Sequence, residues 1–231
     1  EHGFADGFDE WFHTDDAVEP IMLLHLYGKM RAALYADERE IERTKHDRVV
    51  KRAKAIMGAP STAPRMVWVH LSAPEAVHDI MSGMDASEAY AKGIERRRRQ
   101  VSQLARSVPG WLVAVVGTHG VSIGEEGRWG FGHGLTDEEL RVPLAIRRPG
   151  TQGGVVGRQV ATADLGHTLL ASAGAARRFP GQNLLVTRAE PVEVGGVRHD
   201  GNAFAGRTQH GKYVVRESGT VGPGVQLSDR S

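Results

Sequence analysis

Six consecutive apolar residues, Trp111 to Val116, constrain the fold of this chain most strongly. They lie between the Pro109-Gly110 turn and Gly117, and an apolar run bounded in this way is typical of a strand covered on both faces. The glycine-rich sequence from Gly117 to Gly134 follows and predicts a long loop at the strand's carboxyl end. Since ligands in open α/β sheets bind at such ends, the loop is the first place to expect a site.

Strand-like and helix-like patterns alternate along the chain, which favours an α/β fold with a central, mostly parallel sheet flanked by helices. Asp85 and Glu88 resemble a capping box, which predicts a helix from about Ala86 to Arg106. A second helix is expected to begin at Thr162 or Asp164 and to end at Gly174. The remaining expected elements are strands over Met66–Leu71, Trp111–Val116 and Val142–Ile146, and an interrupted helical stretch over Ile21–Met57.

The pattern changes near residue 185 to short valine-rich pieces such as Lys212–Val215. We therefore expect an α/β core over residues 1–185 and a small C-terminal β appendage over residues 186–231.

Charge and composition exclude several function classes. The chain has 29 Lys and Arg against 28 Asp and Glu, so a broad nucleic-acid footprint is not expected. The absence of cysteine excludes a disulfide framework, a thiolate zinc site and a cysteine nucleophile within these residues. No apolar run approaches the roughly 18 residues of a membrane span, and none of the features of a signal peptide follows Glu1. The compartment remains open.

Five pieces of the chain, in collinear order, carry a combined pattern: Gly7–Phe12, Trp68–Leu71, Val115–Gly120, Asp137–Leu144, and Ala163–Leu170 followed by Phe179–Leu184. Together they resemble the C-terminal half of sulfatases in the alkaline-phosphatase-like superfamily. Val115–Gly120 resembles a strand that ends in Ser-Asp-His-Gly-Glu in that family, and Asp137–Leu144 resembles Tyr-Glu-Glu-Leu-Arg-Val-Pro-Leu. Ala163–Leu170 resembles the family's Val-Asp-Leu-x-Pro-Thr-Leu-Leu helix.

This resemblance implies a partial alkaline-phosphatase-like fold and hydrolysis of sulfate, or less favourably phosphate, esters. The substrate would be a small anionic ester or a sulfated glycan, and the cofactor a divalent cation, calcium in the first place. Carboxylates would hold the cation while histidine and lysine donors surround the anion. The nucleophile motif, Cys/Ser-x-Pro-x-Arg, does not occur in this sequence. We therefore expect no turnover from this chain alone.

The resemblance also assigns candidate site residues. His119 keeps the histidine of Asp-His-Gly, whereas Thr118 replaces the metal-binding aspartate, so Thr118 and His119 are the candidate metal ligands. His133 falls at the family's second anion-contacting position. Glu75 stands where another anion-contacting histidine is expected, and nearby His78 could compensate for it. The candidate anion-binding residues are His119, His133 and His78.

Each candidate also has a structural alternative. His119 and His133 could be surface loop histidines, and His70, within an expected strand, is more typical of a hydrogen-bonded core residue. His167 is expected near its helix start in a structural role. The run from Arg96 to Arg99 is expected to form a solvated helix face with one stem packed on apolar neighbours. Glu125 and Glu126 could replace lost metal ligands, although a solvated loop is the simpler interpretation.

Two further functional interpretations stay open at this point. In one, the fold survives as an inactive sulfatase-like module with a binding or scaffold role. Thr118 then stands in place of a metal-binding carboxylate, and Glu75 in place of an anion-contacting histidine. In the other, the chain is an unrelated α/β protein whose matches are coincidental.

Overall fold

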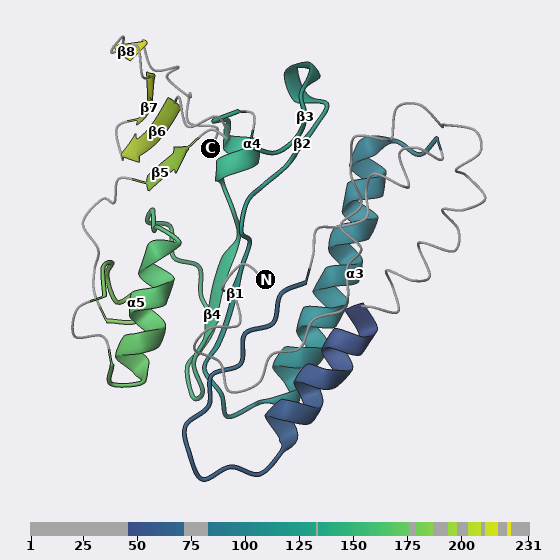
Figure 1. Ribbon diagram of the computed structural model, residues 1–231, viewed down its shortest axis with the longest axis vertical. Helices are drawn as coiled ribbons and strands as arrows, with labels where there is room; N and C mark the ends of the chain where they lie inside the picture. Colours follow the sequence, from purple (N-terminus) through teal and green to yellow (C-terminus); the bar gives the residue numbers. More distant parts are fainter. Residues whose placement is uncertain are drawn as a thin grey trace, which may run out of the picture. The chain divides into compact units, whose positions relative to one another are not determined.

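The computed structural model divides the chain into two compact units, Glu1–Pro109 and Gly110–Ser231 (Figure 1). The residues it describes are 46–71, 83–132, 134–175, 179–186, 194–197, 203–208, 211–216 and 221–222.

The first unit contains a helix over residues 46–58 and the longer helix α3 (Ala86–Ser107). Asp85 caps α3 as the sequence predicts, because its Oδ1 accepts hydrogen bonds from the amides of Ser87 (2.9 Å) and Glu88 (3.1 Å). The Glu88 side chain pairs with Lys92 at 2.9 Å.

Polar contacts join these two helices. The buried guanidinium of Arg97 lies 3.4 Å from His46 Nδ1 and donates to Gln100 Oε1 at 3.0 Å. Gln100 in turn donates to Asp47 Oδ1 at 3.2 Å. The buried apolar side chains of these two helices are small, namely those of Val50, Ala53 and Ala89. One arginine of the Arg96–Arg99 run is therefore a buried connector, while Arg98 and Arg99 are exposed.

The expected buried strand at Met66–Leu71 is not present. Residues 64–71 have no regular secondary structure and pair with no strand in the described part of the chain, and from Arg65 to Leu71 half-buried and exposed residues alternate. Met66 is 59% exposed and Trp68 is 56% exposed. His70 lies on this exposed side, so its interpretation as a core histidine is wrong.

In the second unit, β1 (Val113–Val116) pairs with β4 (Leu144–Arg147) in an antiparallel ribbon, with Val113 opposite Arg147. The expected central, mostly parallel sheet is therefore wrong, since every strand pair among the described residues is antiparallel. The physical reason lies in the connection. A parallel pair needs a crossover, usually a helix, whereas the chain between β1 and β4 contains only a small hairpin and a single helical turn.

That connection is more ordered than the expected loop. It folds into β2 (Ser122–Ile123), the 3₁₀ turn η2 (Glu125–Gly127), β3 (Trp129–Gly130) and the one-turn helix α4 (Asp137–Leu140). Gly124 adopts a φ of 119°, which an L side chain rarely takes, and allows the chain to reverse between β2 and β3.

Helix α5 (Ala163–Ser172) follows, and two of its buried side chains hold the segment at residues 179–186. Asp164 Oδ1 accepts from the amide of Gln182 at 2.9 Å. The fully buried Thr168 Oγ1 accepts from the amide of Leu184 at 2.9 Å and donates to the carbonyl of Asp164. The helix ends at Ser172, and Gly174 just beyond it adopts a φ of 75°, as predicted for a glycine that terminates a helix.

The last four strands, β5 (Val194–Val197), β6 (Ala203–Thr208), β7 (Gly211–Arg216) and β8 (Val221–Gly222), form an antiparallel sheet in sequence order. Buried Ala205 of β6 packs with Leu135, and Leu140 and Val214 join this cluster.

The expected domain boundary at residue 185 stays a prediction. Among the described residues, as the sequence predicts, no helix is long and apolar enough to cross a membrane.

Candidate functional site

Thr118 and His119 lie directly after β1, where the sequence places the candidate site, and both are exposed. Two backbone hydrogen bonds fix the chain on either side of them. The amide of Gly117 donates to the carbonyl of Pro143 at 3.0 Å, and the amide of Gly120 donates to the carbonyl of Glu139 at 2.8 Å. A side chain at position 120 would overlap the carbonyl oxygen of Glu138, so glycine is required there.

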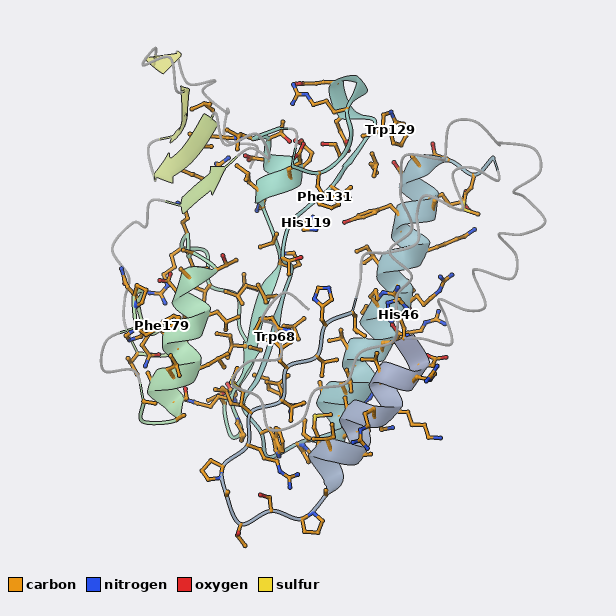
Figure 2. All side chains as sticks on the ribbon, viewed as in Figure 1. His46, Trp68, His119, Trp129, Phe131 and Phe179 are labelled. Carbon is orange, nitrogen blue, oxygen red and sulfur yellow. The ribbon has the colours of Figure 1, made fainter. Side chains whose placement is uncertain are left out.

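The His119 ring stacks on the ring of Phe131, with 3.9 Å between centroids and 27° between planes (Figure 2). Its Nδ1 lies 2.8 Å from the carbonyl oxygen of Gly120. Because a carbonyl can only accept, Nδ1 carries the hydrogen in this contact. The neutral ring therefore offers the lone pair of Nε2 to a cation, whereas the protonated ring offers an Nε2–H donor to an anion. Metal and anion contacts at His119 thus belong to different protonation states.

A buried carboxylate, that of Glu139, organises the glycine-rich loop. Its side chain accepts hydrogen bonds from the amides of Gly132 (2.8 Å) and Gly134 (3.2 Å), and from the hydroxyl of Ser122 at 3.3 Å. Glu139 is only 5% exposed. A side chain at position 134 would come within 2.7 Å of the Glu139 carboxylate, so this turn also depends on glycine.

A second carboxylate at the base of the loop, that of Asp137, forms an ion pair with Arg207 of β6 and contacts Lys212 of β7 at 3.3 Å. Burial raises the pKa of Asp137, but the hydrogen bonds and charges of Arg207 and Lys212 outweigh it and hold that pKa below its ordinary value. Asp137 is therefore a charged connection between α4 and the C-terminal sheet.

The two exposed glutamates of the hairpin, considered above as replacement metal ligands, serve the turn itself. Glu125 accepts from the amide of Ile123 at 2.6 Å, and Glu126 pairs with Arg128. Within the described ranges, no group of three or more His, Asp or Glu side chains could hold a metal ion. Calcium takes six to eight oxygen ligands, mostly carboxylates and carbonyls. Thr118 and His119 alone do not fit that requirement.

No family model matches this chain. No curated protein matches it in sequence either. The resemblance to the sulfatases therefore stays a prediction from the residues quoted above.

The structure brings together Thr118 and His119 and adds Phe131 and Glu139, which sequence reasoning did not single out as site residues. The other two candidate anion contacts, His133 and His78, lie outside the described residues. A sequence signal for Glu139 did exist, since an acidic residue between a glycine-rich run and an apolar strand can cap loop amides. Phe131 carries no comparable signal, because a ring between two glycines does not reveal its stacking partner.

His167 has the expected structural role. It lies on α5, and its Nδ1 is 2.8 Å from the carbonyl oxygen of Phe179, the first residue of the segment at residues 179–186.

Proposed function

We propose that this chain is the C-terminal portion of a sulfatase-like hydrolase, and that His119 contributes to a site for the sulfate group of an anionic ester. A phosphate ester is the less favoured substrate. The nucleophile that the resemblance implies has no counterpart in this sequence, so the chain supplies binding and charge stabilisation rather than the attacking group.

One observation carries the proposal: segments that resemble the sulfatases contact each other in pairs. Val115–Gly120 and Asp137–Leu144 are joined by the β1–β4 ladder and by the two backbone hydrogen bonds around Thr118 and His119. Phe179–Leu184 and the helix at Ala163–Leu170 are joined by the contacts of Asp164 and Thr168. Shared residue types at mutually contacting positions support common ancestry more strongly than scattered matches do.

His119 can act on an oxyanion in a defined way. Its Nδ1–H is held by the Gly120 carbonyl and one ring face is covered by Phe131. The ring orientation is therefore fixed before an anion arrives, and the protonated Nε2 donates to a sulfate oxygen without first losing rotational freedom. Such a donor would also stabilise negative charge that develops on the leaving oxygen.

Calorimetric titration with 4-nitrophenyl sulfate tests the proposal, with 4-nitrophenol as the ligand that lacks the anion. We expect the sulfate ester to bind more tightly than the phenol. His119→Ala should weaken that binding about tenfold or more, because a hydrogen bond to a charged group contributes about 1.5–3 kcal/mol.

The matched control is His167→Ala, which removes a histidine of α5 whose Nδ1 contacts the backbone carbonyl of Phe179. It should leave the affinity unchanged. Equal binding of ester and phenol, or equal losses in the two variants, would contradict the proposal.

A second candidate function is an inactive sulfatase-like module, and the replacement at Thr118 favours it. A hydroxyl is a weak, neutral ligand where the resemblance implies a carboxylate. Calorimetry with calcium, magnesium and manganese separates the two functions. A site retained for chemistry binds one of them with a Kd of about micromolar. An inactive module binds none of the three ions.

A further inference from the structure

The helix over residues 46–58 in the first unit presents a strongly cationic face. Arg48, Lys51 and Arg52 are exposed and lie at i, i+3 and i+4 spacing, opposite the buried His46 and Val50. Lys54 is also exposed. Within the described residues 46–58, the one acidic side chain is that of Asp47, which accepts a hydrogen bond from the side-chain amide of Gln100 on α3.

Helix α3 adds a second excess of positive charge. Arg98 and Arg99 both pair with Glu95, at 2.6 and 3.0 Å, so two guanidiniums share one carboxylate. The hydrogen bonds from Arg98 and then Arg99 lower the pKa of Glu95 to about 2, and the three groups therefore keep one net positive charge at physiological pH. The arginine side chains remain 65% and 71% exposed.

The nearly neutral charge of the whole chain conceals this local excess, since the formal net charge is only +1. A face of this kind attracts a polyanion through many weak contacts rather than one enclosed site. Residues 46–58 contain no aromatic side chain on which nucleic-acid bases could stack. The charge pattern therefore suits a chain of sulfate groups better than single-stranded nucleic acid.

We infer that the exposed cations of the helix at residues 46–58, together with the Arg98 and Arg99 pair of α3, bind a sulfated glycan chain. The choice of sulfate as the anion rests on the proposed function, whereas the positive charge of this surface is observed independently of it. The face would hold the sugar chain through its sulfate groups.

The test compares binding of the whole chain to a heparin oligosaccharide, to the same oligosaccharide after desulfation, and to single-stranded DNA of matched charge. The variant is Arg48→Gln/Lys51→Gln, which removes two exposed charges and keeps similar helix propensity. The control is Arg141→Gln/Arg148→Gln, which removes two exposed charges from the second unit. Affinities are measured over a series of salt concentrations, with circular dichroism to verify folding.

We expect heparin to bind more tightly than either comparison ligand. In the helix variant, the slope of the logarithm of the affinity against the logarithm of salt concentration should fall by about two, one for each cation removed. The control should keep the wild-type slope. Absence of heparin binding, equal losses in the two variants, or DNA binding as tight as heparin binding would overturn the inference.

This outcome is separable from the proposed function. Aryl sulfate binding at His119 is measured with a monovalent ligand and with His119→Ala, neither of which involves the helix at residues 46–58. If heparin does not bind, binding of the aryl sulfate at His119 can still be measured, and the reverse also holds.

Discussion

Glu139 illustrates how a single buried carboxylate sets the geometry around the candidate site. Its side chain holds the amides of Gly132 and Gly134, and its backbone carbonyl holds the amide of Gly120. Glu139 therefore joins the segment just after β1 to the glycine-rich loop. His119 keeps its orientation only while Gly120 and Phe131 stay in place, so the loop contacts of Glu139 matter to a residue that Glu139 does not touch.

We predict that Glu139→Leu loosens this loop. Leucine has no acceptor, so the amide hydrogens of Gly132 and Gly134 lose their partner, at a cost of about 1–3 kcal/mol each. Hydrogen exchange at these two amides should accelerate about tenfold to a hundredfold. Glu138→Leu, at the exposed neighbouring position, serves as control and should leave both exchange rates unchanged. Unchanged exchange in Glu139→Leu would show that the carboxylate does not hold the loop.

The ion pair of Asp137 gives a prediction for pH. Its pKa in the folded chain lies below the ordinary value of 3.8, so the pair stabilises the fold at pH values above that value. This stabilisation is lost as the pH falls through the folded-state pKa. We expect Asp137→Asn to lower the urea midpoint at neutral pH, and the gap from wild type to shrink only below the ordinary aspartate pKa. A gap that stays constant down to the lowest pH would contradict the assignment.

At the residue scale, the sequence correctly places Thr118 and His119 after the end of a strand. Their role in a site stays a prediction. The sequence gives poor access to Phe131 and to the exposed position of His70. Both features depend on which neighbours the folded chain supplies. The sequence of residues 66–71 does not say which of its side chains will meet a partner.

At the scale of secondary structure, local signals predict the helices well. The Asp85 cap and the Gly174 end are determined by residues within one or two turns, and both occur as expected. Two of the three expected strands lie close to their expected positions, as β1 (Val113–Val116) and β4 (Leu144–Arg147), whereas the one at Met66–Leu71 is absent. Strand partners are not local, however. The direction of the β1–β4 pair depends on the path of the whole connection, which a run of apolar residues does not encode.

Helix α5 and the segment at residues 179–186 should behave as one element. We predict that Thr168→Val, which keeps the shape but removes the hydroxyl, leaves the amide of Leu184 without an acceptor. Exchange at that amide should accelerate about tenfold to a hundredfold, for a cost of about 1–3 kcal/mol.

Thr162→Val is the matched control for this substitution, since Thr162 is exposed and its side chain makes no capping hydrogen bond. Its effect on stability should stay within about 0.5 kcal/mol. Equal effects of the two valine substitutions would mean that the Thr168 hydroxyl does not secure the segment.

At the scale of the whole molecule, the two proposed binding surfaces lie in different units of the chain. The second unit contains His119 and the segment pairs that resemble sulfatases, and the first unit contains the cationic helix pair. The α/β alternation of the sequence predicted one parallel sheet through both parts. It could not predict this division, because an alternating pattern specifies the order of elements and not which of them share a sheet.

The central claim is that His119 is an oriented oxyanion contact, and the most direct measurement is the NMR signal of its imidazole ring during a titration with inorganic sulfate. The account predicts a saturable shift of the His119 Nε2 and Cε1–H resonances, with the His167 resonances unchanged. Shifts of equal size at His119 and His167, or no saturable shift at His119, would contradict it.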